Sequence, residues 1–301
     1  MNIVAHIEDA LQAAIAAGEV RGCPPRLAAA IRHAVFPAGA RIRPQLCLAV
    51  AQACGPDDPS LAMAAAISIE LLHCASLVHD DLPCFDDADT RRGQPSVHRA
   101  FGESLAVLAG DALIVLAFQT LARASQKSPL RLAPLLDTIG NGVGMPFGIV
   151  AGQAWECESK VSLSDYQRAK TGALFVAATA AGALAAGADP LPWRALGDWL
   201  GEAYQVADDI RDVLADPQLL GKPVGQDLAL GRPSAAIDLG LAGAIEHFEA
   251  LVQAAVNAVP EGAKFDAMRQ LVRLEAERLV PRSACDRYRH TASSPAKPVV
   301  A

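Results

Sequence analysis

The sequence predicts an all-α fold, and three of its features lead to that prediction. Apolar residues make up 52% of the 301 residues, aromatic residues make up only 5%, and alanine is very frequent. Alanine costs least in a helix and allows helices to approach each other closely. Apolar residues recur with helical spacing between Gly and Pro breaks, and no segment alternates with the period of two that is typical of a strand. We therefore expect packed helices and no sheet.

About ten helices are expected, each bounded by residues that end helices. Their predicted ranges are 2–17, 25–35, 42–54, 60–80, 101–124, 132–153, 163–186, 192–214, 232–257 and 263–279. The breaks fall at Pro24-Pro25, Pro37-Ala38-Gly39, Gly55-Pro56, Pro83, Gly93-Gln94-Pro95, Ser128-Pro129, Asp189-Pro190 and Gly221-Lys222-Pro223. Because the linkers are short and evenly spread, we predict a single domain over 1–301. The polar, Pro-rich segment 281–301 is expected to be a flexible tail.

Charge and composition exclude several classes of protein. The net charge of −7 argues against a nucleic-acid partner, which would require a basic face. The apolar stretch 173–188 is short for a membrane span and is closed by Asp189-Pro190, so we expect a buried helix and no transmembrane segment. The N-terminal residues lack the basic and apolar regions of a signal peptide. The seven cysteines form no Cys-x-x-Cys pair, which favours a cytoplasmic location.

The strongest signal for function is an acidic cluster that follows an apolar helix. Residues 80–89 contain five aspartates, among them Asp80, Asp81 and Asp86. A run of acids is usually a solvated surface. Here the acids lie at the C-terminal end of a helix, where the helix dipole disfavours negative charge, and they interrupt apolar sequence, where unpaired charge is costly. A bound cation would remove both problems.

A second acidic cluster occurs near the end of another apolar helix. Asp208 and Asp212 are four residues apart, so both project from one helical face, and Gln205 lies on the same side one turn earlier. Ligands that are all carboxylate oxygens suit Mg²⁺ or Mn²⁺ better than zinc. Magnesium bound by a few carboxylates usually completes its coordination with water and substrate phosphates, so the two clusters point to diphosphate chemistry.

Basic residues near the clusters support this interpretation. They are Arg41, Arg43, Arg91, Arg92, Lys170 and Lys222. Each alone is typical of a surface salt bridge, but arginine's planar guanidinium pairs well with phosphate oxygens. His73 lies about two helical turns before Asp80 on the same face. A histidine within a helix is more often a core residue, but next to these clusters a contact to a diphosphate is comparably plausible.

These residues resemble the motifs of the trans-isoprenyl diphosphate synthases, the family of the farnesyl and geranylgeranyl diphosphate synthases. The resemblance runs from about 37 to 235. The matching segments are Glu70-Leu71-Leu72-His73, Val78-His79-Asp80-Asp81-Leu82-Pro83, Arg91-Arg92-Gly93, Gly110-Asp111-Ala112-Leu113, Gly152-Gln153, Lys170-Thr171-Gly172, Tyr204-Gln205 with Asp208-Asp209, and Gly221-Lys222. The resemblance implies an isoprenoid synthase fold of type I, in which an all-α bundle surrounds a deep central cavity, and usually a homodimer.

The resemblance also implies roles for individual residues. About three Mg²⁺ ions would hold the allylic diphosphate, with Mn²⁺ as a possible substitute; their ligands would be Asp80, Asp81, Asp86, Asp208 and Asp212. The same diphosphate would contact Arg91, Lys170 and Lys222. Isopentenyl diphosphate would contact Arg43, His73 and Arg92. The dipoles of Thr171 and Gln205 would stabilise the cation that develops when the carbon–oxygen bond breaks.

The sequence departs from the family pattern at a few basic positions. Ala40 replaces the lysine expected to bind isopentenyl diphosphate, and Arg41 is the residue we expect to compensate for it. Arg211 stands where the second motif usually has an aliphatic residue. Arg232 replaces a lysine and is expected to contact substrate. These changes bear on the affinity for isopentenyl diphosphate and on activity.

Product length depends on the residues that line the path of the growing chain. In the family, an aromatic residue five positions before the first aspartate stops growth at the farnesyl stage, and here that position is Ala75, followed by Ser76. We therefore expect the C20 product. A floor of the cavity could come from Leu113, Leu116 or Phe118, although residues of this kind are more often ordinary core residues.

Three other functions would explain part of this pattern. Farnesyl diphosphate synthase is the nearest alternative, and a terpene cyclase is disfavoured because the second cluster lacks the Asn/Ser/Glu metal triad of cyclases. A catalytically silent regulatory subunit would explain Ala40 and Arg211, but it would not need two intact aspartate clusters. The leading hypothesis, a geranylgeranyl diphosphate synthase, requires the two clusters to converge on one apolar cavity.

Overall fold

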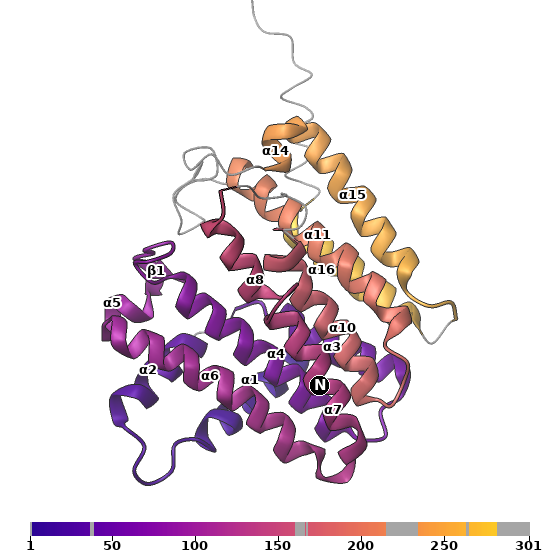
Figure 1. Ribbon diagram of the computed structural model, residues 1–301. Helices are drawn as coiled ribbons and strands as arrows, with labels where there is room; N and C mark the ends of the chain where they lie inside the picture. The colour runs from indigo at the N-terminus through magenta and orange to yellow at the C-terminus, as the bar shows by residue number, and fades with distance from the viewer. Residues whose placement is uncertain are drawn as a thin grey trace, which may run out of the picture. The chain divides into compact units, whose positions relative to one another are not determined.

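The computed structural model describes residues 2–36, 39–159, 166, 168–214, 234–262 and 265–281. Its elements are almost all helical, as predicted (Figure 1). The chain divides into two compact units, an N-terminal unit (Met1–Gly201) and a C-terminal unit (Glu202–Ala301). The boundary between them falls within α11 (Leu191–Leu214).

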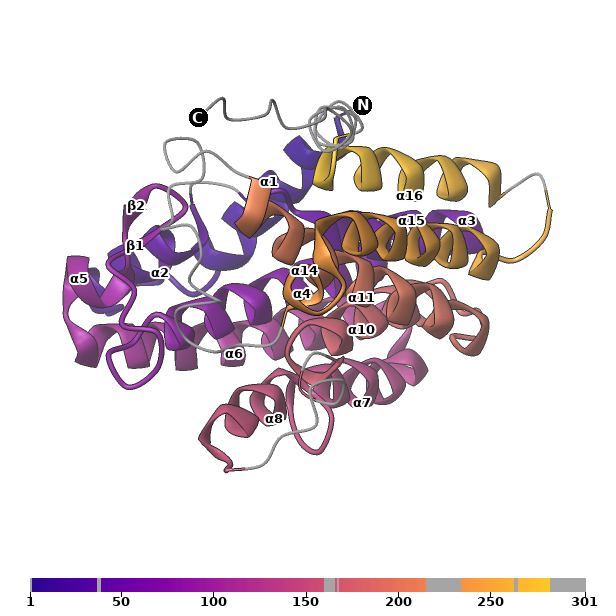
Figure 2. The ribbon, with the colours of Figure 1, turned by 90° about the horizontal axis from the view of Figure 1, so that it is seen from above.

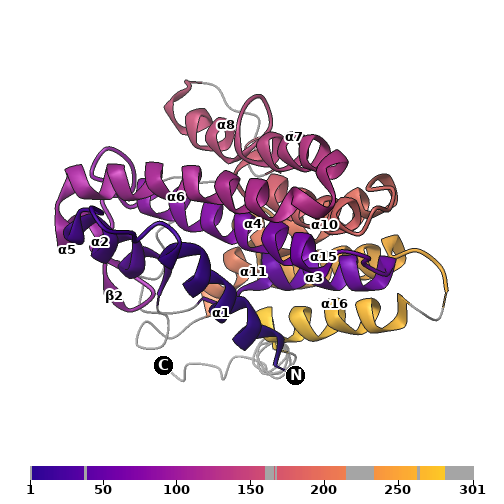
Figure 3. The same cartoon turned by 90° about the horizontal axis from the view of Figure 1, so that it is seen from below.

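The N-terminal unit is a stack of helices around one long central helix, α4. Its helices are α1 (Ile3–Ala16), α2 (Pro25–Val35), α3 (Ile42–Cys54), α4 (Pro59–Asp80), α5 (Val97–Phe101), α6 (Glu103–Ala124), α7 (Leu132–Val143), α8 (Ile149–Ala154) and α10 (Ala173–Ala185). Short 3₁₀ turns are η1 (Ser125–Lys127), η2 (Pro129–Arg131) and η3 (Trp155–Cys157), and η4 (Arg168–Gly172) is a π-helical turn. Figures 2 and 3 show α7 and α8 on one side of the α4–α6 pair, with α1 and α2 on the other.

Helix α4 is fixed at its start and buried along most of its length. The side chain of Asp58 accepts a hydrogen bond from the Leu61 backbone N–H, and Pro59 occupies the first turn, where its missing N–H has no cost. The helix packs against α6, α3 and α10. The hydroxyl of the buried Ser68 lies within hydrogen-bond distance of the Ala64 and Ala117 carbonyls. The Ser68 hydroxyl is therefore satisfied inside the core. This packing gives a rigid support to the acidic segment 80–89 at the end of the helix.

Small residues allow the neighbouring helices to approach α4 and each other closely. A Cβ atom on Gly182 of α10 would collide with the backbone carbonyl of Cys47 in α3. The main core cluster of the unit draws its side chains from α1, α3, α4, α6, α7 and α10. The close packing of these helices explains why the sequence is rich in alanine.

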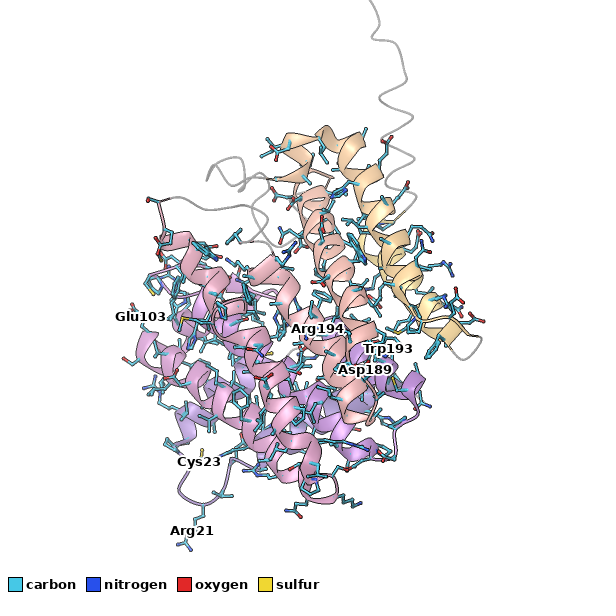
Figure 4. The ribbon with its side chains drawn as sticks, turned by 45° about the vertical axis from the view of Figure 1, so that its right-hand side comes forward. Arg21, Cys23, Glu103, Asp189, Trp193 and Arg194 are labelled. Atoms are coloured by element: carbon cyan, nitrogen blue, oxygen red, sulfur yellow. The ribbon has the colours of Figure 1, made fainter. Side chains whose placement is uncertain are left out.

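The C-terminal unit has its own core, formed along the end of α11. Its further helices are α14 (Ala235–Asp238), α15 (Gly240–Ala258) and α16 (Asp266–Leu279). Side chains of α11 and α15, including Val206, Ile210, Ile245 and Phe248, form its apolar cluster. The start of α11 belongs to the N-terminal unit, where Asp189 accepts a hydrogen bond from the Leu191 backbone N–H; Figure 4 labels Asp189 there, together with Trp193 and Arg194.

Several predicted boundaries were wrong, mostly because glycines interrupt helices. The predicted helix 101–124 is divided at Gly102, whose φ is 90°. The predicted helix 132–153 is divided between Val143 and Ile149, and the predicted helix 232–257 begins as the short α14 and restarts at Gly240, whose φ is 68°. Apolar periodicity continues through these breaks, so the sequence pattern alone did not reveal them.

The prediction of no sheet was also wrong. A two-stranded antiparallel hairpin forms from β1 (Thr90–Arg91) and β2 (Gln94–Pro95). The two residues between the strands, Arg92 and Gly93, have φ values of 53° and 76°. Positive φ at both central residues is the geometry that closes a two-residue hairpin. The hairpin places Arg91 and Arg92 on a defined turn next to the first acidic cluster.

Among the residues that the structure describes, two helices are long and apolar enough to span a membrane by length and composition. They are Pro59–Asp80 and Glu103–Lys127, with mean hydropathies of 1.9 and 2.0. In the first, 78% of the apolar window is buried inside the protein, which is expected of a core helix; in the second the value is 39%. The expectation of no transmembrane segment therefore stays a prediction.

Candidate active site

The first acidic cluster forms a compact loop over the C-terminal end of α4. The helix ends at Asp80, as predicted, and the backbone then turns back on itself. The Asp86 N–H donates to the Asp80 carbonyl at 3.0 Å, and the Ala88 N–H donates to the Asp81 carbonyl at 3.2 Å. These two hydrogen bonds satisfy carbonyls at the end of the helix and bring Asp86 beside Asp80.

Asp80 is the carboxylate of this loop that most lacks partners. Its side chain is 16% exposed, and its buried Oδ1 has no hydrogen-bond partner among the described residues. The Lys170 Nζ lies 3.5 Å from that oxygen. Burial raises the pKa of Asp80; the charge of Lys170 opposes this and that of Asp86 adds to it. An ionised carboxylate in this position is energetically costly until more positive charge arrives.

Asp81 is buried and forms an ion pair with Arg91. Its side chain is 2% exposed and is held by the Arg91 guanidinium, whose Nε lies 2.9 Å and 3.2 Å from the two carboxylate oxygens and whose Nη2 also donates to Oδ1. Burial lowers the pKa of Arg91, but the hydrogen bond to Asp81 and the charges of Asp81, Asp80 and Asp86 together raise that pKa above its ordinary value. Asp81 therefore fixes Arg91, and its role as a metal ligand stays a prediction.

Arg92 lies at the turn of the hairpin with an incompletely satisfied guanidinium. Its Nη1 is buried and has no hydrogen-bond partner within the described part of the chain. Gly39 lies directly against it, since a Cβ atom at Gly39 would come within 2.8 Å of Nη2. The predicted role of Arg92 as an anion ligand fits a buried donor that still lacks an acceptor.

His73 and Arg43 lie together near Arg92. The Arg43 Nη1 is 3.4 Å from the His73 Nε2, and the guanidinium stacks over the Phe175 ring at 4.5 Å from its centroid. Burial lowers the pKa of His73 well below its ordinary value, and the charges of Arg43 and Arg92 lower it further. His73 is therefore neutral at physiological pH in a positive surrounding that favours an anion.

Arg41 is not placed as predicted. Its side chain is fully buried and its donors are occupied: Nε lies 2.8 Å from Glu8, Nη1 lies 2.5 Å from Glu70, and Nη2 donates to the Val35 carbonyl at 2.8 Å. Burial alone would lower the pKa of Arg41, but the carboxylates of Glu8 and Glu70 raise it above its ordinary value. The prediction that Arg41 binds substrate in place of a lysine at position 40 was therefore wrong, because the guanidinium is committed to two acids.

Lys170 and Thr171 lie on the π-helical turn η4, a local geometry often found at functional sites. The turn is close to α8, because a Cβ atom on Gly152 would collide with the Lys170 backbone. Burial disfavours the charged amine, but Asp80 and other acidic neighbours outweigh it, so the pKa of Lys170 is raised. Lys170 therefore stays protonated beside Asp80.

Glu156 is a residue of this site that the sequence interpretation missed. Its Oε1 lies 2.6 Å from the Lys170 Nζ and accepts a hydrogen bond from the Tyr166 hydroxyl at 2.5 Å, and its Oε2 accepts from the Gln153 amide at 2.9 Å. The available signal was the three-residue spacing from Gln153 to Glu156, which places both on one helical face. Glu156 thus holds Lys170 in position next to Asp80.

The second acidic cluster lies on α11 within the C-terminal unit. Asp208 is exposed and pairs with Arg211, one turn later on the helix. Asp209 is 2% exposed and accepts hydrogen bonds from the Gln205 amide at 3.0 Å and from the Ala235 backbone N–H at 2.8 Å. Asp212 is half-buried. Asp208 and Asp212 therefore remain the candidate ligands of this cluster, and Gln205 is fixed by Asp209.

The residues predicted to set product length lie in the core between α4 and α6. Ala75 and Leu113 are 1% and 0% exposed and belong to the main core cluster with Leu116, and Phe118 packs against that cluster. The Ser76 hydroxyl donates to the His73 carbonyl at 2.8 Å. Lys222, Arg232 and the segment 282–301, to which a substrate-binding role or a flexible tail was assigned, lie outside the described residues.

The donor set of the first cluster fits a hard divalent cation. The Asp80 oxygen is buried and unpartnered, and Asp86 is close enough to raise the pKa of Asp80. Among the described residues, no three His, Cys, Asp or Glu side chains already lie within reach of one metal position. Such a partial site suits Mg²⁺, which is usually bound by one or two carboxylates together with substrate phosphates.

Comparison with known proteins gives consistent results. The polyprenyl synthetase family model matches residues 24–271. The geranylgeranyl diphosphate synthase of Cereibacter sphaeroides is 53% identical over 91% of this chain and 96% of that protein, and the enzyme of the same name from Rhodobacter capsulatus is 48% identical over 94% and 99%. The crystal structure of a geranyltransferase from Legionella pneumophila is 27% identical, covers 91% of this chain and 93% of its own, and superimposes with a TM-score of 0.78. These similarities confirm the resemblance seen in the aspartate motifs: the chain belongs to the polyprenyl synthetase family, that of the trans-isoprenyl diphosphate synthases.

Proposed function

We propose that this protein is a geranylgeranyl diphosphate synthase that condenses isopentenyl diphosphate with allylic diphosphates in the presence of Mg²⁺. The observation that carries the proposal is the buried Asp80 oxygen, which has no hydrogen bond among the described residues and lies beside Lys170 and Arg91. A carboxylate with adjacent cations is the arrangement that binds a metal–diphosphate complex, since it supplies a ligand to the metal and donors to the phosphate oxygens. The names of the two bacterial relatives agree with this function.

The allylic diphosphate is assigned to the end of α4 and the turn η4. Asp80 and Asp86, with Asp208 and Asp212 of the second cluster, would be the ligands of about three Mg²⁺ ions, for which Mn²⁺ could substitute. When bound, the ions supply positive charge that stabilises the diphosphate as a leaving group. Lys170 and Arg91 are already held in place by Glu156 and Asp81, so they can contact the same diphosphate without being reorganised.

Isopentenyl diphosphate is assigned to the group formed by Arg43, His73 and Arg92. Burial, followed by the charges of Arg43 and Arg92, lowers the pKa of His73, and the two nearby guanidiniums support an anion-binding role at this position. A neutral imidazole and two guanidiniums can donate several hydrogen bonds to one diphosphate. Since Arg41 is committed elsewhere, this group would have to act without the lysine that Ala40 replaces.

The proposed reaction breaks the bond between the allylic carbon and the diphosphate oxygen. The alkene of isopentenyl diphosphate supplies the electron pair of the new carbon–carbon bond, and the proton lost afterwards passes to the departing diphosphate. Thr171 and Gln205 would orient their oxygen dipoles toward the allylic cation, and Gln205 has the support of Asp209 for this. No nucleophilic side chain is required.

The C20 product is proposed from the small side chain of Ala75 one to two turns before Asp80 on α4. Its replacement by Phe should shorten the main product from C20 to C15, because the aromatic ring would occupy the space of the last isoprene unit. Product chain length would be measured by mass spectrometry after hydrolysis of the diphosphate. A Leu121→Met variant, which conserves volume at another buried position of the same core cluster, is the matched control. An unchanged C20 product in Ala75→Phe would remove Ala75 from the chain-length path.

A homodimer and a cytoplasmic location are part of the same proposal. Helix α6 is strongly apolar yet leaves Val107, Leu108 and Val115 exposed by 41%, 51% and 55%. Their spacing puts them on adjacent parts of one helical face, and such a patch is typical of an association surface. The six cysteines of the described chain are all free, which supports a reducing compartment. Sedimentation of the purified protein tests the dimer, and a monomer at micromolar concentration would contradict it.

One assay separates the proposed function from its alternatives. The purified protein is incubated with Mg²⁺, isopentenyl diphosphate and, in turn, dimethylallyl, geranyl or farnesyl diphosphate. We expect geranylgeranyl diphosphate as the end product. An end product of C15 would indicate a farnesyl diphosphate synthase, which is the second candidate. No turnover with any starter would instead indicate a silent subunit, for which the neutralisation of Asp208 by Arg211 is the specific structural argument.

A further inference from the structure

A buried carboxylate, Glu70, links two arginines that come from distant parts of the chain. Glu70 lies on α4 one turn before His73 and is 2% exposed. Its Oε1 is 2.5 Å from the Nη1 of Arg41, which precedes α3, and 4.0 Å from the Nη2 of Arg92, at the turn of the β1–β2 hairpin. The contact with Arg41 is a hydrogen-bonded ion pair, whereas the contact with Arg92 is electrostatic only.

The two arginines are satisfied to different degrees. Arg41 has acceptors for all its nitrogens in Glu8, Glu70 and the Val35 carbonyl. Arg92 has a buried Nη1 that lacks an acceptor in the part of the chain the structure describes. A buried donor without an acceptor costs free energy, and such a group persists where a ligand can supply the acceptor. Glu70 therefore attracts Arg92 without consuming its remaining donor.

The Glu70 carboxylate is held in place by Arg41. Arg41 is bonded to Glu70 on one side and to Glu8 of α1 on the other, at 2.8 Å and 3.4 Å. The residue has a φ of 50°, which is uncommon for a residue with a side chain. Arg41 is thus a buried counterion that holds the Glu70 carboxylate at a fixed place on α4.

Steric contact limits the Arg92 guanidinium from the other direction. The guanidinium lies directly against Gly39, where a larger residue would displace it, because a Cβ atom there would lie 2.8 Å from Nη2. The backbone of Arg92 has a φ of 53° in the hairpin turn, so the side chain starts from a defined point. The guanidinium therefore has the Glu70 carboxylate 4.0 Å from its Nη2 and the Gly39 backbone directly against it.

We propose that Glu70 is a positioning residue for Arg92, which it orients so that Nη1 is kept for the diphosphate of isopentenyl diphosphate. This inference rests on the proposed function, since it assigns that substrate to Arg92. The proposal predicts that removing the Glu70 carboxylate weakens diphosphate binding, which is opposite to the effect expected from charge alone. If only charge mattered, removal of a carboxylate near the substrate would strengthen diphosphate binding; if positioning matters, the same change weakens it.

The test compares Glu70→Gln with Glu8→Gln. Both variants remove one carboxylate charge from Arg41, but only the first removes the partner of Arg92. For Glu70→Gln we expect the KM for isopentenyl diphosphate to rise about tenfold, with the KM for the allylic diphosphate within about twofold of wild type. For Glu8→Gln we expect both KM values within about twofold of wild type, although both variants lower Tm.

A double-mutant cycle with Arg92→Gln completes the test. If Glu70 acts through Arg92, Glu70→Gln should raise the KM for isopentenyl diphosphate no further once Arg92 is replaced. The proposal is overturned if Glu70→Gln leaves this KM unchanged or lowers it, or if the two effects multiply. Should Glu70→Gln not fold, Glu70→Asp, which retains the charge on a shorter side chain, enters the same cycle. Lack of turnover by the wild-type enzyme would instead refute the proposed function.

Discussion

Asp80-Asp81 and Asp208-Asp209 are both pairs of adjacent aspartates near the ends of helices, and in both the second aspartate is 2% exposed. Asp81 is bonded to the Arg91 guanidinium, and Asp209 is bonded to the Gln205 amide and to the first N–H of α14. Neighbouring residues of a helix point in different directions, so one member of each pair faces the interior when the other faces outward. The comparison shows that the buried second aspartate of each pair is bonded within the protein, and we predict that the first aspartate is the one that binds ligands.

The first members of the two pairs differ in their surroundings. Asp80 is mostly buried, and its Oδ1 has the Lys170 amine 3.5 Å away but no hydrogen bond among the described residues, whereas Asp208 is 55% exposed and is paired with Arg211. Burial therefore makes the charge of Asp80 costly, and the charge of Asp208 is exposed to water. A metal–diphosphate complex should depend more strongly on Asp80 than on Asp208.

The largest effect is expected for Asp80→Asn. The variant keeps the size of the side chain but removes the charged ligand, so kcat should fall about 10³-fold, the range seen when a group that stabilises developing charge is lost. Steady-state kinetics at saturating Mg²⁺ would measure this. An Asp80→Asn enzyme with wild-type kcat would show that Asp80 is no metal ligand.

The same variant should be more stable than wild type when metal is removed. Because burial raises the pKa of Asp80 in the folded protein, the ionised carboxylate destabilises the fold above that pKa, and the penalty disappears as the pH falls through it. With a chelator present, Asp80→Asn should therefore have the higher Tm at pH 7.5, and the difference should shrink toward pH 4.5. A lower Tm at pH 7.5 would mean that Lys170 and Arg91 more than compensate the burial.

Asp81→Asn should show the opposite pattern, with a large effect on stability. It leaves the Arg91 guanidinium without its buried carboxylate, and breaking such a pair costs about 3 kcal/mol. Urea unfolding would measure the free energy, with Asp87→Asn in the same loop as the control, because Asp87 is 54% exposed. A free energy of unfolding equal to that of the control would contradict the assigned role of Asp81.

Arg211→Ile should have a small effect in the direction of gain. Freeing Asp208 from its neighbour should lower the Mg²⁺ concentration for half-maximal activity about two- to threefold, as expected for an exposed ion pair. Arg273→Ile on the exposed face of α16 controls for the change in net charge. A Mg²⁺ requirement that is unchanged, or that rises, would indicate that Arg211 itself contacts substrate.

Features that depend on one segment of sequence were predictable, and those that depend on tertiary contacts were not. The end of α4 at Asp80 and the shared face of Asp208 and Asp212 follow from local spacing. The burial of Arg41 could not be read from its sequence neighbours, because its acids are 33 positions before it and 29 after it. The hairpin at Arg92 was not predicted, because strands of two residues are too short to show an alternating pattern.

We predict that both acidic clusters bind one metal–diphosphate complex. Calorimetric titration of inorganic pyrophosphate into wild type, Asp80→Asn and Asp208→Asn, each with and without Mg²⁺, tests this most directly. We predict that tight binding requires Mg²⁺ and is weakened in both variants, more in Asp80→Asn. Undiminished Mg²⁺-dependent binding by Asp208→Asn would contradict the claim, because the second cluster would then lie outside the diphosphate site.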